Sequence, residues 1–199
     1  MKVPRLSELI DETEVTWLMS RYGPSHRVYI PVAMSESDFD YWWQKLVQQR
    51  DRRGEVVLAI QRADGNVLLH TKSFYPADIY RLPTGGVYPW EKVLTGAMRE
   101  AKEETGFDVC IVRMVGMVTY TFHNGERCMP FVSYVLLARS GDVLPAVVDS
   151  EENISDFRFV PPEQLRHTAQ TLRQLSGRMA GWGAFRAPPH EMVASALGV

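Results

Sequence analysis

Alternating hydrophobic and polar positions in the middle of the chain predict a run of β-strands. Two short apolar segments, residues 55–62 and 66–74, flank Ala63-Asp64-Gly65, a sequence typical of a β-hairpin turn. Further strand patterns follow at residues 108–122, 127–139 and 154–160. Because strands dominate this region around one central and one C-terminal helical segment, the pattern predicts a layered α/β domain.

Helical spacing of apolar residues predicts the remaining elements. The central helix is expected over Glu91 to Thr105, with Gly106 as its left-handed stop. Its apolar stripe consists of Val93, Leu94, Ala97, Met98 and Ala101. Other helices are expected over residues 7–22, from about 36 to 46, over 161–175 and, in the tail, only over the short segment 190–196.

The chain divides into three parts by pattern. Residues 1–54 form an N-terminal extension of helices and one strand, which begins at Arg27. Phe39, Trp42 and Trp43 of this extension lie at helical spacing, which favours packing anchors over a ligand platform. Residues 55–176 form the main domain and residues 177–199 a C-terminal tail. A total of 199 residues suffices for one core of useful size.

Charge and composition narrow the classes of partner. The net charge of −2 gives no general attraction to nucleic acids or anionic membranes. The longest uncharged apolar run, between Arg127 and Arg139, is too short to span a bilayer. The acidic N-terminus has no signal-peptide pattern, and Cys110 and Cys128 read as buried thiols of a reducing compartment. We therefore expect a cytoplasmic protein.

Three glutamates within one helical turn carry the main chemical signal. Glu100, Glu103 and Glu104 stand at positions i, i+3 and i+4, so their carboxylates project from one helix face. Like charges at this spacing repel, and only Arg99 and Lys102 are near enough to relieve them. A bare acidic helix face is usually only solvated. A carboxylate cluster backed by an apolar stripe also suits a hard cation such as Mg²⁺.

The spacing around these glutamates separates the two interpretations. Gly85 is followed by Glu91 after five residues, and Arg99 comes after seven more. Glu100, Glu103, Glu104 and Gly106 complete the fixed positions. Such a pattern should arise by accident on the order of once in a million chains.

The segment from Gly85 to Phe107 resembles the Nudix box. All seven polar and glycine positions of the box are present, and Ala101 and Phe107 fill its apolar positions. Upstream, Thr84 and Trp90 stand where the family commonly has glycine. The box covers 23 residues, and the flanking strand pattern extends the similarity from about residue 54 to 175.

This resemblance implies a fold and a metal site. The implied fold is a Nudix α/β/α sandwich with a mixed sheet, preceded here by the N-terminal extension. The implied metal is Mg²⁺, with Mn²⁺ as a substitute. Its expected ligands are the carboxylates of Glu100, Glu103 and Glu104 and the carbonyl of Gly85. Arg99 would hold the glutamates in register, and Glu91 would support the loop without contacting metal.

The resemblance leaves the general base open. Glu103 or Glu100 is the first choice, because some family members use a glutamate within the box. Glu151 or Glu152, on a later acidic loop, is the alternative. Ordinary solvated acids would give the same loop pattern.

Residues outside the box could contact the substrate. Arg81 and Lys72 could bind phosphate oxygens, although solvated surface positions are equally consistent with the sequence. Tyr120 and His123 could contact a base, although alternating aromatic residues in strands usually serve the core.

We therefore expect a Mg²⁺-dependent pyrophosphohydrolase that cleaves the diphosphate link of a small nucleoside diphosphate-X compound. Nucleoside triphosphates, nucleotide sugars and related diphosphates stay open as substrates. Two alternatives are a non-catalytic ligand-binding protein of the same fold and an enzyme acting on RNA 5′ ends; no basic run supports the latter. The N-terminal extension could cover the site or form a homodimer contact.

Overall fold

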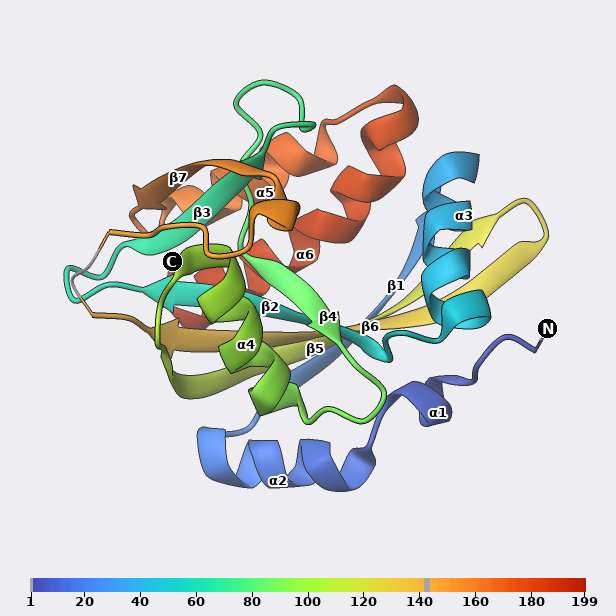
Figure 1. Cartoon of the computed structure of the whole chain (residues 1–199), viewed down its shortest axis with the longest axis horizontal. Helices are drawn as coiled ribbons and strands as arrows, with labels where there is room; N and C mark the ends of the chain where they lie inside the picture. Colours follow the sequence, from blue (N-terminus) through green and yellow to red (C-terminus); the bar gives the residue numbers. More distant parts are fainter. Residues whose placement is uncertain (1, 142–143) are drawn as a thin grey trace.

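A mixed β-sheet forms the centre of the computed structural model, which describes residues 2–141 and 144–199 (Figure 1). Its strands are β1 (His26–Ala33), β2 (Gly54–Gln61), β3 (Val67–Lys72), β4 (Thr84–Val87), β5 (Cys110–Asn124), β6 (Arg127–Arg139) and β7 (Ile154–Val160). Their order is β1-β5-β6-β2-β3-β7, and β4 pairs with β2 beside this path. The β1–β5 and β2–β6 pairs are parallel, and the other pairs are antiparallel.

Helices cover both faces of this sheet (Figure 1). They are α1 (Leu6–Leu9), α2 (Glu12–Tyr22), α3 (Glu36–Trp43), α4 (Val93–Thr105), α5 (Gln164–Arg173) and α6 (Ala180–Ala196). One buried apolar cluster joins the sheet to α2 and α4, and a second joins it to α3, α5 and α6. The arrangement confirms the expected α/β/α sandwich with a mixed sheet and a preceding N-terminal segment.

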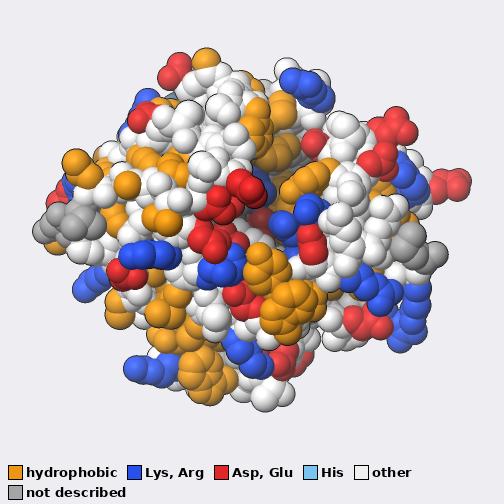
Figure 2. All heavy atoms as spheres, in the orientation of Figure 1, with side chains coloured by type: hydrophobic (Ala, Val, Ile, Leu, Met, Phe, Trp, Pro, Cys, Tyr) orange, Lys and Arg blue, Asp and Glu red, His pale blue; other side chains and the backbone are white. Residues whose placement is uncertain are grey.

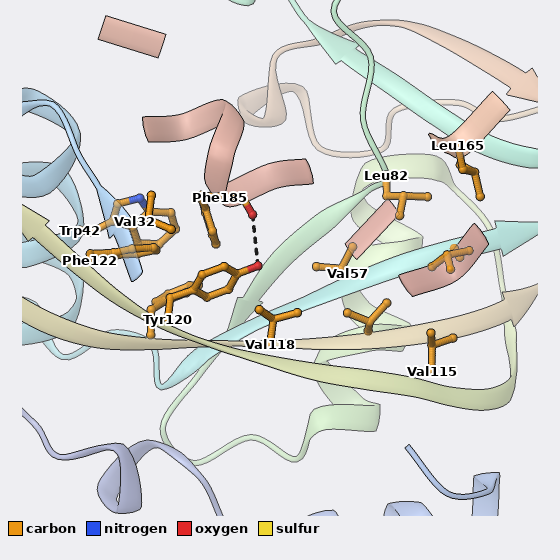
Figure 3. Close-up of a cluster of buried hydrophobic side chains, with 14 of the residues drawn as sticks. Val32, Trp42, Val57, Leu82, Val115, Val118, Tyr120, Phe122, Leu165 and Phe185 are labelled. Atoms are coloured by element: carbon orange, nitrogen blue, oxygen red, sulfur yellow. Dashed lines mark hydrogen bonds between the residues drawn. The ribbon is translucent and has the colours of Figure 1, made fainter. Parts of the chain in front are cut away.

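Strand β2 shows why the central sequence is continuously apolar. Val57 and Ala59 face the cluster beneath α3 and α6, part of which Figure 3 shows. Val56, Leu58 and Ile60 face the cluster beneath α2 and α4. A strand that is buried on both faces needs apolar side chains at successive positions. The predicted hairpin between β2 and β3 is confirmed, with Gln61 paired to Val67.

The N-terminal segment adds elements to the same sandwich. The helix expected over residues 7–22 is interrupted at Asp11, whose carboxylate accepts hydrogen bonds from the backbone of Thr13 and Glu14 and so begins a new helix, α2. Strand β1 then forms an edge of the sheet, where Pro31 is tolerated because it need not donate to a second neighbour.

Helix α4 carries the acidic motif, and its ends follow from local chemistry. The helix begins at Val93 rather than at the expected Glu91, whose carboxylate instead accepts a hydrogen bond from the backbone of Tyr88 at 3.2 Å. It ends at Gly106, which has a φ of 74°. The predicted left-handed stop is therefore confirmed.

The C-terminal tail contains much more helix than the short segment 190–196 that the sequence predicts. Helix α6 runs for 17 residues and includes Pro188 and Pro189. Proline has no N–H for the carbonyl four residues earlier, so Pro189 leaves the Phe185 carbonyl free. The hydroxyl of Tyr120 donates to that carbonyl at 3.1 Å, as Figure 3 shows. Within the described ranges, no helix has the length and hydropathy that crossing a membrane requires.

The two cysteines differ from the prediction. Cys110 begins β5 and Cys128 lies beside the β5–β6 turn, and both side chains are exposed. Their apolar sequence neighbours suggested burial, but both positions lie near strand ends.

Candidate active site

Gly85 and Glu100 meet where strand β4 faces helix α4. Gly85 pairs with Val56 of the central strand, so its backbone position is fixed by the sheet. A Cβ atom placed on Gly85 would lie only 1.7 Å from Cδ of Glu100. The position therefore requires glycine, because the Glu100 carboxyl group rests directly against the backbone of residue 85.

Two of the three clustered glutamates are buried. Glu100 is 6% exposed and Glu104 is 0% exposed. Loss of water around the carboxylates raises the pKa of Glu100 to about 7 and that of Glu104 to about 8. Nearby cations oppose these shifts: Arg99 for Glu100, and Arg81 and Lys72 for Glu104.

Glu104 has unequal oxygens. Its Oε2 accepts a hydrogen bond from the backbone of Thr84 at 3.1 Å. Its Oε1 is buried and accepts no hydrogen bond, although Lys72 Nζ lies 3.4 Å away. A buried carboxylate oxygen without a hydrogen bond is costly for the fold, and such an atom is a candidate ligand for a bound cation.

Arg99 connects the remaining acidic residues of the motif. Its guanidinium donates to both carboxylate oxygens of Glu91 at 3.0 Å, and also to Glu100 at 2.8 Å and Glu103 at 2.9 Å. It also donates to the carbonyl of Gly86 at 2.7 Å. This geometry lets one cation orient three carboxylates and the end of β4.

Glu103 connects the helix to the later acidic loop. Its carbonyl accepts hydrogen bonds from the backbone of Val148 and Asp149, which hold the following Ser150–Glu152 turn close to the helix. In that turn, Glu152 accepts a hydrogen bond from Lys72 at 2.6 Å. Glu151 is exposed; its backbone N–H donates to Asp149, and its carbonyl accepts a hydrogen bond from the Asn153 side chain.

A cavity of about 430 Å³ opens beside these groups. Acidic side chains gather near the middle of the face in Figure 2, next to a hollow bordered by basic and apolar side chains. Lining residues from the predicted site are Gly85, Glu100, Glu152, Lys72 and Arg81. The cavity therefore brings carboxylates and cations of the predicted site to one opening.

Arg81 and Lys72 occupy the positions expected of phosphate-binding residues, although Arg81 is much more buried than expected. Arg81 is 3% exposed and donates to the Tyr75 hydroxyl at 2.8 Å and the Thr84 hydroxyl at 2.7 Å. Lys72 reaches the cavity from the end of β3.

Tyr120 and His123 do not have the positions expected of base-binding residues. Tyr120 is 1% exposed and lies in the apolar cluster under α6, where its hydroxyl satisfies Phe185 (Figure 3). Burial raises its pKa well above the usual range. His123 pairs with Cys128 near the far end of β5 and does not line the cavity. The alternation of aromatic residues along β5 serves the core.

Several residues of the cavity were not identified from the sequence. They are Asp38, Tyr41, Trp42, Arg52, Glu55, Phe74, Thr84, Gly86, Tyr88, Trp182 and Arg186. Tyr41 and Trp42 lie on the predicted N-terminal helix, but Trp182 and Arg186 fall in a tail for which little structure was expected. No local motif could have joined these distant segments.

The chemistry of the donors fits a hard divalent cation. Glu100, Glu104 and the Gly85 carbonyl offer only oxygen, which Mg²⁺ prefers. Glu104 Oε1 is a buried acceptor that lacks a hydrogen bond. Within residues 2–141 and 144–199, no three acidic, imidazole or thiol side chains converge on one point. A metal ion held by all three glutamates would need Glu103 to leave Arg99.

Comparison with one solved structure shows the fold, and two further matches have lower scores. A Nudix hydrolase from Nitrosomonas europaea matches with a TM-score of 0.51 and 17% identity, over 71% of this chain and 88% of that one. A C. elegans Ap4A hydrolase binary complex has a TM-score of 0.48 and 19% identity, over 72% and 96%. The E. coli dihydroneopterin triphosphate pyrophosphohydrolase has a TM-score of 0.46 and 16% identity, over 65% and 92%.

Sequence comparison identifies the family. No curated protein sequence matches this chain. The family model described as NUDIX domain matches residues 46–180, which is more than half of the chain. The matched region contains β4, α4 and the later acidic loop. The chain belongs to the Nudix hydrolase family.

Proposed function

We propose that this protein is a Mg²⁺-dependent pyrophosphohydrolase that cleaves the diphosphate link of a nucleoside diphosphate-X compound. The observation that carries the proposal is the pair of buried carboxylates, Glu100 and Glu104, held against β4. Glu100 lines the cavity, and Glu104 lies behind the lining, against Thr84 and Lys72. Lys72 and Arg81 line the same cavity and provide positive charge for phosphate groups.

The residues that would hold the metal are the carboxylates of Glu100, Glu103 and Glu104 and the carbonyl of Gly85. A bound Mg²⁺ ion, or Mn²⁺ in its place, would neutralise charge on the diphosphate and acidify a water molecule. Arg99 keeps Glu100 and Glu103 near each other before binding, since one guanidinium nitrogen donates to both. Glu91 accepts hydrogen bonds from the other two nitrogens of the Arg99 guanidinium and so helps to orient it.

A carboxylate accepts the proton of the attacking water. The water oxygen forms a bond to phosphorus while the bond from phosphorus to the bridging oxygen breaks. This leaves two phosphate products. Glu103 is the first candidate base because its side chain is 36% exposed, although it does not line the cavity, and Glu100, which does, is the second. On the loop, Glu152 is the stronger alternative, because it lines the cavity whereas Glu151 does not.

Lys72 has a further role in this proposal. Its ammonium group lies between Glu104 and Glu152, 3.4 Å and 2.6 Å from their nearest oxygens. An entering polyphosphate brings additional negative charge to the same place, so Lys72 can transfer its contact from a carboxylate to a phosphate oxygen.

A product screen tests the proposal. Nucleoside triphosphates, nucleotide sugars and dinucleoside polyphosphates are incubated with Mg²⁺, and both products are identified by ion-exchange chromatography. We expect cleavage between two phosphorus atoms, no cleavage when a chelator removes the metal, and at least a hundredfold loss in Glu103→Gln or Glu104→Gln. Tight substrate binding without any product would indicate a non-catalytic binding protein instead.

A further inference from the structure

Two buried polar atoms of residues that line the cavity have no hydrogen-bond partner, and both residues lie outside the acidic motif. Asp38 Oδ2 and Arg186 Nε accept or donate no hydrogen bond. In the described part of the chain, the Asp38 carboxylate as a whole has no hydrogen bond or ion pair, since only its backbone N–H bonds, to Ser35. Arg186 uses Nη1 for both oxygens of Glu55, at 2.8 Å, which leaves Nε free to donate.

Helix position alone does not explain Asp38. An acidic residue in the first turn of α3 is favourable for the helix dipole, but this effect needs no buried oxygen. Asp40, two residues later, is exposed and pairs with Arg127 at 2.8 Å. Asp38 instead is half-buried in the cavity wall, and its buried Oδ2 has no donor, which is costly unless a ligand supplies one.

Aromatic side chains supply a large part of the cavity wall. Tyr41 and Trp42 come from α3 of the N-terminal segment. Phe74, Tyr75 and Trp182 come from the loop after β3 and from the first turn of α6, and they contact each other through ring pairs 5.1 Å and 4.8 Å apart. Aromatic surfaces with a few polar groups are typical of sites for flat heterocycles.

We propose that the part of the cavity lined by Asp38 and Arg186 binds a heterocycle. This heterocycle presents two adjacent N–H donors beside a ring carbonyl. The Asp38 carboxylate accepts only, so two of its oxygens suit neighbouring N–H groups, and Arg186 Nε suits the carbonyl. Guanine and pterins have this edge. Adenine and cytosine place a ring acceptor beside their amino group, and uracil flanks its single N–H with two carbonyls, so each would bring an acceptor toward the Asp38 carboxylate.

The proposal deepens the hydrolase assignment, on which it rests for the position of the phosphates. It makes Asp38 a specificity-determining residue, supplied by the segment that precedes the matched family region. The test must therefore separate recognition of the heterocycle from hydrolysis.

Calorimetric titration with compounds that contain no phosphoanhydride makes this separation. The intact protein is titrated with GMP, AMP, CMP, UMP and neopterin in the presence of Mg²⁺. We expect GMP to bind at least about tenfold more tightly than the other three nucleotides, and Asp38→Asn to remove this preference. Neopterin binding that is weakened by Asp38→Asn without a preference for GMP would support the same edge in a pterin.

The matched control is Asp40→Asn, which changes an equivalent side chain on the same helix outside the cavity. It should leave every affinity within twofold of the parent. The proposal is overturned if AMP, CMP or UMP binds as tightly as GMP and neopterin does not bind, or if Asp38→Asn keeps the parent's affinities. A GMP preference without turnover of any phosphoanhydride would overturn only the hydrolase assignment, and turnover without dependence on Asp38 would overturn only the specificity site.

Discussion

Buried carboxylates occur in two kinds of surroundings in this molecule. Glu14 accepts hydrogen bonds from Arg53 at 2.6 Å and from the backbone of Val93 at 2.7 Å. Glu55 is similarly satisfied by Arg186 and Ser133. Glu104 is at least as buried, yet one of its oxygens has no hydrogen bond.

The difference separates structural acids from acids of the candidate site. Glu14 joins α2 to the start of β2 and to the first residue of α4, so its two oxygens are used by the fold itself. Glu104 leaves an acceptor for something that the chain does not supply. Removal of the cation that pairs with a structural acid should therefore lower the stability of the fold. Removal of a carboxylate of the candidate site should lower activity.

The largest expected effect is on turnover. Glu103→Gln should lower kcat by roughly 10²- to 10⁴-fold, the range for loss of a positioned general base, and Glu104→Gln, which removes a proposed metal ligand, by at least about 10²-fold, while urea unfolding stays close to that of the parent. Steady-state kinetics with the substrate identified in the product screen measures the effect. Glu126→Gln, on the exposed β5–β6 turn, is the control. Activity within a few fold of the parent would remove these glutamates from the mechanism.

Arg53→Met should break the structural kind of contact. Glu14 would then be a buried charge without its ion-pair partner, which typically costs about 3 to 5 kcal/mol of unfolding free energy. Arg27→Met, which removes the exposed partner of Glu12, should cost less than about 1 kcal/mol. Equal losses of the free energy of unfolding in the two variants would contradict the structural role of the buried pair.

Gly85→Ala tests the contact between β4 and the Glu100 carboxyl. The new Cβ would occupy the place of that carboxyl group, so Glu100 must move, and a displacement of about 1 Å can cost about a hundredfold in turnover. Gly141→Ala is the matched control because no atom lies within 4 Å of its added Cβ. If the two variants have the same kcat, the close approach at Gly85 has no part in catalysis.

A further effect is a pH dependence of stability in the metal-free protein. Glu100 and Glu104 have folded pKa values of about 7 and about 8, against an ordinary value of 4.5. Between pH 4.5 and 8 the folded chain holds protons that the unfolded chain has released, so the free energy of unfolding falls as pH rises. The slope is at most about 1.4 kcal/mol per pH unit for each group.

Buried histidines act in the opposite direction at lower pH. Burial lowers the pKa of His70 and lowers that of His190 to about 3, so both favour folding more strongly as pH rises toward 6.5. Urea unfolding with EDTA between pH 7.5 and 8.5, where unfolded histidines are almost fully deprotonated, therefore separates the glutamates from the histidines. The downward slope should be smaller in Glu104→Gln, and an unchanged slope would show that Glu104 does not titrate in this range.

Local patterns predicted the parts of the site that lie within one element. The stripe on α4 and the stop at Gly106 follow from helical period and glycine conformation, and these also place the three glutamates on one turn. Such patterns could not predict a hydrogen bond between residues that are distant in the sequence. Pro188 and Pro189 suggested a break, but Tyr120, distant in sequence, satisfies the carbonyl that Pro189 leaves free.

The residues proposed to bind the heterocycle could not be brought together from the sequence either. Asp38, Trp182 and Arg186 come from segments separated by more than half of the chain, and no spacing rule joins them. In the sequence, Asp38 is only a favourable residue in a first helical turn. Only the structure, in which α3 and α6 cover the same sheet, shows that Asp38 lines the cavity and that its Oδ2 has no hydrogen-bond partner.

Calorimetric titration of Mg²⁺ at pH 7, in buffers of different ionisation enthalpy, tests most directly whether the unsatisfied acids form a cation site. Because the pKa values of Glu100 and Glu104 are raised, Mg²⁺ should bind with release of protons, and the heat should change with the buffer. Glu104→Gln should weaken binding and reduce the proton release. Binding of equal affinity in parent and variant, or heat that is the same in every buffer, would contradict the account.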